Sequence, residues 1–226
     1  MKLLTVGNAK TSRGESLGIL TGILHLNPHA DERLCPYAST ECKLNCLVKS
    51  GRAEFMPAIT VARTKKTREF YENRQAFVEQ LRKDIKALAK RAAKLGMVPA
   101  VRLNGTSDIL WEKLTSLMVD FPEVQFYDYT KVPLRYRGKL ANYHLTFSYS
   151  GDNWDDCLEA ISRGINIAVV FAGNMPSEWR GLEVIDGTVH DVRFIDSIKG
   201  GVVGLCPKGR TAKLAAKSNS KFIVKA

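Results

Sequence analysis

Residues 97–130 read MVPAVRLNGTSDILWEKLTSLMVDFPEVQFYDYT and indicate the fold class. The stretch begins with a strand and turn over 97–105, continues with a helix over 106–121 and ends with a second strand over 123–130. Short apolar strands joined through a helix are typical of a parallel sheet with crossover helices.

The same alternation extends in both directions from this stretch. LGILTGILHL, from Leu17, is apolar and rich in Ile and Leu, and predicts a buried strand. Residues 54–96 predict one or two long helices, because apolar residues recur every three or four positions from Phe77 to Ala92 and Gly96 stands where a C-terminal cap belongs. Further strands are expected at 142–150, 165–173, 181–187, 191–196 and 200–206, with a helix at 154–164.

These elements predict an α/β fold that resembles a TIM barrel, either a complete or a partial β/α barrel, with a mainly parallel sheet and crossover helices. We expect one domain over residues 1–226, with a cysteine loop at 34–52 and a basic C-terminal tail at 208–226. An open doubly wound sheet is the alternative, and it is less favoured because no Gly-rich dinucleotide fingerprint follows the first strand.

Composition restricts the class of protein. A hydrophobic content of 45% is normal for a packed globular chain. The sequence has no apolar run of about 18 residues, and its first residues turn polar too soon for a signal peptide. We therefore expect a cytoplasmic protein without a membrane span.

Charge points to a polyanionic partner. The chain has 34 Lys and Arg against 23 Asp and Glu, a formal net charge of +11. The excess gathers in the basic zone 63–74 and in the tail, which contains Lys208, Arg210, Lys213 and Lys217. A nucleic acid or a nucleotide is the expected partner, and a solvated helix face with a loose tail is the alternative.

Polar residues follow nearly every predicted strand. In barrels and open α/β sheets, sites form at the carboxyl ends of the strands, so these residues are expected to converge. Substrate contacts are expected from Arg102, Asn104, Ser107, Ser148, Lys208 and Arg210. Asp108, Asp128 and Lys131 are the candidate catalytic residues. Ser107 or Asp108 could equally serve as a helix N-cap.

Asp128 is the candidate with the strongest individual signal. QFYDYTK places its carboxylate between two tyrosines of a strand that should be apolar. A buried carboxylate needs a partner, such as Lys131, Arg102 or a ligand. Its position near the end of the strand predicts that it lies at the mouth of the site.

The cysteine loop LCPYASTECKLNCLVKSGR, residues 34–52, has the spacing C-x6-C-x3-C at Cys35, Cys42 and Cys46. An odd count of five cysteines in a reducing compartment does not suggest disulfides. Three thiols on one loop suit a metal, with Cys206 as a possible fourth ligand. Iron–sulfur is favoured over zinc, because no second C-x-x-C pair follows. Metal-free thiols remain the alternative, and Cys157 is expected in the core.

Several motifs together resemble one family. They are NAKTSRGES, GILTGILHLNP, CPYASTECKLNCL, RLNGTSDILWE, FYDYTK, NYHLTFS, AVVF and GLCPKGR, and they span nearly the whole chain. In this combination the chain resembles the phage proteins called gene product eighty-eight. The order of cysteine loop, NGTSD turn and aromatic third strand is distantly similar to radical S-adenosylmethionine enzymes, although their usual spacing is C-x3-C-x2-C. That likeness implies a [4Fe-4S] cluster and S-adenosylmethionine.

Two classes of function follow. The first is a metal-dependent enzyme that modifies a nucleic acid base or a nucleotide, with an iron–sulfur cluster and radical-type chemistry. A zinc-dependent base-exchange enzyme of the transglycosylase kind, with Asp108 or Asp128 as nucleophile, is its neighbour. The second class is a non-catalytic protein in which a metal fixes the loop and the basic surfaces hold nucleic acid or a host protein. Acids at the strand ends favour an enzyme, because a phosphate binder gains nothing from them.

Overall fold

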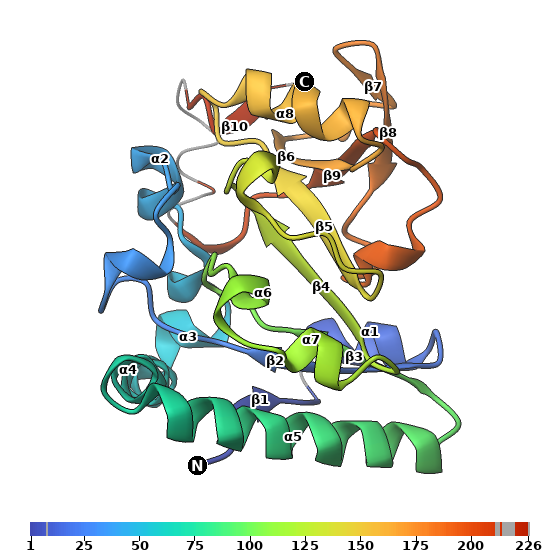
Figure 1. Cartoon of the computed structure of the whole chain (residues 1–226). Coiled ribbons are helices and arrows are strands. Elements are labelled where there is room, and N and C mark those ends of the chain that lie inside the picture. Colours follow the sequence, from blue (N-terminus) through green and yellow to red (C-terminus); the bar gives the residue numbers. More distant parts are fainter. Residues whose placement is uncertain (8, 211–212, 214–219, 226) are drawn as a thin grey trace.

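The computed structural model describes all residues except 8, 211–212, 214–219 and 226 (Figure 1). The described residues form a ten-stranded sheet with helices packed against it. The strands are β1 Leu4–Thr5, β2 Ile19–Leu24, β3 Val98–Arg102, β4 Gln125–Thr130, β5 Tyr143–Ser148, β6 Ile167–Ala172, β7 Glu178–Trp179, β8 Leu182–Asp186, β9 Val202–Leu205 and β10 Ile223–Lys225. The α-helices are α1 Ala9–Glu15, α2 Thr40–Leu44, α3 Arg52–Phe55, α4 Pro57–Glu72, α5 Arg74–Lys94, α6 Trp111–Leu114, α7 Leu117–Asp120 and α8 Trp154–Ser162. Short 3₁₀ turns lie at η1 Glu32–Leu34, η2 Leu47–Lys49, η3 Leu134–Tyr136 and η4 Arg193–Ile195.

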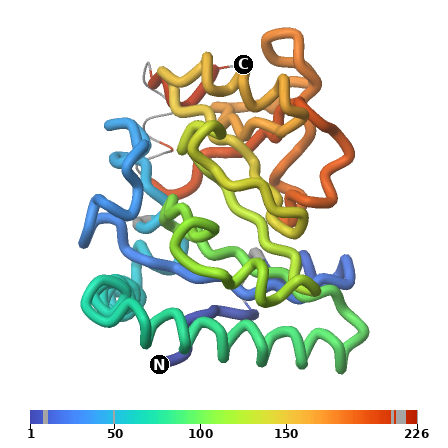
Figure 2. Tube along the Cα trace, in the orientation of Figure 1, coloured from blue at the N-terminus to red at the C-terminus, as the bar shows by residue number. Residues whose placement is uncertain are grey.

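The sheet is mainly parallel, as the sequence predicts, but the described strands do not close into a barrel. The strand order is β1-β2-β3-β4-β5-β6-β9-β8-β7. The two end strands are antiparallel to their neighbours, because β1 pairs antiparallel with β2 and β7 pairs antiparallel with β8. From β2 to β6 the order follows the chain, so each crossover adds the next strand. Figure 2 shows this progression from the N-terminal part at one end of the molecule to the last third at the other. The predicted TIM-like barrel, complete or partial, is therefore corrected to an open, mixed sheet in the part of the chain that the structure describes.

Strand β10 pairs with the carboxyl half of β6, beyond the part of β6 that pairs with β5. β6 pairs with β5 only through Ile167 and Ala168, whereas Val170 to Ala172 pair with β10. Val170 also pairs with Leu205 of β9, so β10 must occupy the edge of β6 that faces β5. The end of the predicted basic tail is thus part of the sheet, and β5 and β6 separate toward their carboxyl ends.

Alternation along the strands divides the apolar residues between two faces. Leu20 and Val101 belong to the large core cluster, which also contains Leu81 and Ile85 of α5 and Cys157 of α8. Their strand neighbours Ile19 and Ala100 belong to a small cluster with Tyr127 and Val192. Cys157 is fully buried, as predicted for a core residue.

Two predicted elements differ from the structure. The helix expected at 106–121 is two short helices, α6 and α7, because Thr115 between them is extended, with φ −148° and ψ 161°. The strand piece expected at 191–196 contains the turn η4, and Arg193 Nη1 lies 3.6 Å from Oδ2 of Asp196, the residue that caps this turn. A polar pair at this spacing fits a helical turn, not a strand.

Packing of α5 against the sheet is testable by a matched pair of substitutions. Leu81 of α5 is fully buried, whereas Leu158 of α8 is 48% exposed. Leu81→Ala is expected to lower the free energy of unfolding by about 2–5 kcal/mol because it leaves a cavity. Leu158→Ala is expected to change it by less than about 1 kcal/mol. Urea denaturation measures both, and equal losses would contradict the assigned core.

Candidate functional site

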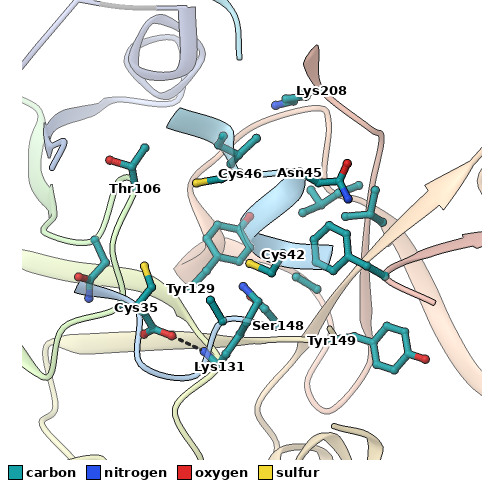
Figure 3. Close-up of a pocket in the computed structure, with 18 of the residues that line it drawn as sticks. Cys35, Cys42, Asn45, Cys46, Thr106, Tyr129, Lys131, Ser148, Tyr149 and Lys208 are labelled. Carbon is teal, nitrogen blue, oxygen red and sulfur yellow. Dashed lines mark hydrogen bonds between the residues drawn. The ribbon is translucent and has the colours of Figure 1, made fainter. Parts of the chain in front are cut away.

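A cavity of about 210 Å³ opens at the carboxyl ends of the parallel strands (Figure 3). Its walls come from the segments that follow β2, β3, β4, β5, β8 and β9, together with part of β6 and of the segment around β10. Parallel pairing brings these segments together because all the strand ends meet at one edge of the sheet. This is the location expected from the sequence.

Four of the five cysteines line this cavity. Cys35, Cys42 and Cys46 are half-buried in the loop after β2, and Cys206 is exposed directly after β9. The loop is held in short helical turns. Ser39 caps α2 by accepting a hydrogen bond from the backbone N of Cys42 at 3.2 Å, as N-cap residues commonly do. The four thiols therefore border one space, although they come from segments far apart in the sequence.

Lys131 lies among the thiols (Figure 3). Burial by itself lowers the pKa of Lys131, but Cys42, Asp108 and Cys35 outweigh it, so the pKa is raised above its ordinary value. The side chains of Lys131 and Cys42 are hydrogen-bonded. Burial raises the pKa of Cys35 to about 12, with a further contribution from Asp108 and an opposing one from Lys131. An ammonium group therefore faces the thiol groups inside the cavity.

Asp108 joins three segments at the cavity wall. Its backbone N donates to the carbonyl of Leu34 at 2.8 Å, which ties the turn after β3 to the cysteine loop. Its carboxylate accepts hydrogen bonds from Thr130 Oγ1 at 2.8 Å and from the backbone N of Lys131 at 2.7 Å. Asp108 thus lies at the cavity, as predicted, and its contacts position the cysteine loop relative to the end of β4.

Asn104 organises the turn between β3 and α6. Its Oδ1 accepts from Ser107 Oγ and from the backbone N of Ile109, both at 2.9 Å, and from Trp111 Nε1 at 3.2 Å. Asn104 and Ser107 line the cavity, but these bonds engage their side chains with each other and with the turn. Gly105 has no room for a side chain, because a Cβ there would lie 2.5 Å from the carbonyl oxygen of Leu24. The structure thus gives both polar residues a positioning role.

Asp128 does not lie at the mouth of the site, which corrects the sequence-based expectation. It is 1% exposed and is not among the residues that line the cavity. One carboxylate oxygen accepts from the backbone N of Asn104 at 2.8 Å and the other from Tyr143 Oη at 3.0 Å. Within β4 only Tyr129 lines the cavity, and the side chain of its neighbour Asp128 lies on the opposite face of the strand because side chains alternate.

Arg102 is also engaged by protein groups. Its Nη1 donates to Asp191 Oδ2 at 2.7 Å, its Nε lies 3.9 Å from Asp128 Oδ1, and its guanidinium lies over the Tyr129 ring at 4.7 Å. Burial lowers the pKa of Arg102, but Asp191 and Tyr129 outweigh burial and raise the pKa above its ordinary value. Arg102 and Asp191 line the cavity as a neutralised pair.

The remaining predicted residues divide between the cavity and the surface. Ser148 and Lys208 line the cavity. Arg210 is exposed and lies outside the lining of the cavity, and Lys217 of the predicted tail lies outside the described residues. Sequence analysis missed Tyr129 and Asp191. The only signal for Asp191 was its place in a polar segment, TVHDVRF.

The donor chemistry of the cavity suits a thiophilic metal, since iron–sulfur clusters and zinc both take Cys thiolates. In the part of the chain that the structure describes, no three His, Cys, Asp or Glu side chains are grouped so that they could hold a metal ion. The four thiols share a cavity but are not arranged as a ligand set. Metal binding by these cysteines therefore stays a prediction.

Comparison with known proteins identifies the family of the chain. The profile of the family described as Gene product 88 matches residues 2–226. No curated protein and no solved structure matches the chain. Among the described residues, no helix combines the length and the apolar character needed to cross a membrane.

The buried position of Asp128 predicts a specific pH dependence of stability. Burial raises its pKa to about 7, although Arg102, Asn104 and Tyr143 oppose the shift. At pH values between 3.8, its ordinary pKa, and about 7, Asp128 keeps its proton in the folded state but has lost it in the unfolded state. Rising pH through this window therefore destabilises the wild type relative to Asp128→Asn, by at most about 1.4 kcal/mol per pH unit. Urea denaturation of both proteins at pH 5, 6, 7 and 8 measures this, and parallel curves would refute it.

Proposed function

The chain belongs to the Gene product 88 family of phage proteins, and we propose that it is a metal-dependent enzyme that modifies a nucleic acid base or a nucleotide. In this proposal Cys35, Cys42 and Cys46 hold an iron–sulfur cluster. The cavity at the carboxyl edge of the sheet is the active site.

One observation carries the proposal. Cys206 is distant from the cysteine loop in sequence, yet all four of these thiols line the same cavity, whereas Cys157 is packed in the core. Thiols gathered on an accessible cavity are typical of metal or redox chemistry, whereas buried structural cysteines are inert. The cavity also contains Asp108 and Lys131, so the thiols adjoin groups that can hold or transfer a proton.

The metal decides which chemistry is available. An iron–sulfur cluster supplies one-electron chemistry, and with an iron left open it would also bind S-adenosylmethionine. If Cys206 is a fourth ligand, the cluster is closed and that cofactor has no open iron. Zinc is the alternative metal. Of the two nucleophiles considered for base exchange, Asp108 is then the candidate, because Asp128 does not line the cavity.

Residues of the chain would recognise the substrate. Each carboxylate oxygen of Asp108 accepts one hydrogen bond from the protein, so each retains a further lone pair. Asp108 can therefore accept a hydrogen bond from an amine or hydroxyl of a base or sugar. The ammonium group of Lys131 can donate to a carbonyl oxygen or ring nitrogen. These two roles are complementary to the mixed donor and acceptor edges of a nucleobase.

A second candidate follows from the hydrogen bond between Lys131 and Cys42. A cysteine on an accessible cavity, next to a group that can hold or transfer a proton, is a candidate nucleophile. Cys42 would then act as a nucleophile without a metal. The two candidates differ in whether the pure protein contains stoichiometric metal.

We predict that anaerobically purified protein contains iron and sulfide, and that Cys42→Ala loses both. Replacing a ligand removes a metal–thiolate bond, and the remaining thiols hold the cluster too weakly to retain it. Cys157→Ala is the matched control, because Cys157 is free and lies in the core. It should retain the metal. Metal and sulfide analysis of the three proteins measures the outcome.

Two results would decide against the cluster. Equal iron content in wild type and Cys42→Ala would reject Cys42 as a ligand. Wild-type protein that contains no metal, but in which Cys42 is the cysteine alkylated fastest by iodoacetamide, would favour the thiol nucleophile instead.

A further inference from the structure

A second hollow, of about 520 Å³, adjoins the cysteine cavity. We call it the basic groove, and its polar side chains are His25, Ser50, Arg63, Thr106, Lys208 and Lys213. The groove and the cavity share Leu47, Gly105, Thr106, Pro207 and Lys208. A ligand could therefore occupy both spaces at once.

The charge of the basic groove is not neutralised by the described residues. No carboxylate lines it. None of the ion pairs within the described ranges includes Arg63, Lys208 or Lys213. The cysteine cavity differs, because its Arg102 is paired with Asp191. The groove thus offers uncompensated positive charge to an anion.

Arg63 is the best-positioned cation of the groove. It is half-buried on α4, and its Nη1 donates to the carbonyl of Val48 in the cysteine loop at 3.2 Å. That bond fixes the guanidinium and leaves the other N–H donors for a ligand. Burial lowers the pKa of Arg63, and Cys46 opposes this shift. A partly desolvated guanidinium gains more from an anion than a fully hydrated one.

Lys208 links the two spaces. It follows Cys206 and Pro207 after β9, is exposed, and lines both the groove and the cavity. An anionic group held between Arg63 and Lys208 would lie next to the entrance that the groove shares with the cysteine cavity. Phosphate fits this pair, because Arg binds phosphate oxygens in a bidentate manner and Lys adds a point charge.

We propose that the basic groove binds a phosphate group of the substrate through Arg63 and Lys208, and that the attached nucleoside extends into the cysteine cavity. The position of the nucleoside rests on the proposed function, whereas phosphate binding by the groove does not. The phosphate belongs either to a free nucleotide or to a single strand of nucleic acid.

The test measures affinity of the full chain for two probes, thymidine 5′-monophosphate and a labelled thymidine tetranucleotide. Arg63→Gln and Lys208→Gln are each expected to weaken binding about tenfold, or about 1.4 kcal/mol. Arg68→Gln is the control, because Arg68 is an exposed arginine on the same helix, and its affinity should stay within about twofold of wild type. Arg63→Lys keeps the charge but loses the bidentate geometry, so its affinity should lie between those of wild type and Arg63→Gln.

The two probes distinguish the source of the phosphate. Tighter binding of the tetranucleotide, with a log–log salt slope of about −0.7 per phosphate contacted, assigns the groove to a strand. Equal affinity assigns it to a free nucleotide. Unchanged affinity in both groove variants, or no binding of either probe, would overturn the proposal. Metal content separates the two proposals, because Arg63→Gln should lose affinity for the probes while it retains the metal content of wild type.

Discussion

Parallel strand pairing is the constraint on which the site depends. Strands β2 to β6, β9 and β8 run in the same direction, so the segments that follow them gather at one edge. The separation of β5 from β6, with β10 inserted at the carboxyl half of β6, leaves space there. Residues as distant in sequence as Cys35 and Cys206 meet in that space only because of this pairing.

Buried polar groups then fix the segments around that space. Asp128 holds the backbone of Asn104, and Asn104 holds the turn that carries Ser107 and Asp108. Asp108 in turn binds the cysteine loop through the carbonyl of Leu34. A buried carboxylate is costly unless it is paired and hydrogen-bonded, and Asp128 has both kinds of partner. This chain of contacts connects the interior of the sheet to the cysteines.

The sequence predicted the local elements and the location of the site better than it predicted the roles of individual residues. The strand at Ile19–Leu24 and helix α5 follow from periodicity, and the grouping of Cys206 with the loop follows from its place after a strand. The predicted position of Asp128 at the mouth was wrong, because its contacts with Tyr143 and Asn104 are tertiary and cannot be read from the local sequence. Arg63 was not distinguishable from other charges of a basic run, since only the fold shows that it faces a groove.

The central claim, that cysteines of one cavity bind a metal, is tested most directly by X-ray absorption spectroscopy of anaerobically purified protein. The account predicts a first shell of three or four sulfur atoms around the metal, with an additional iron–iron shell for a cluster. Zinc would give sulfur at about 2.3 Å without that second shell. A first shell made only of nitrogen and oxygen atoms would contradict the account.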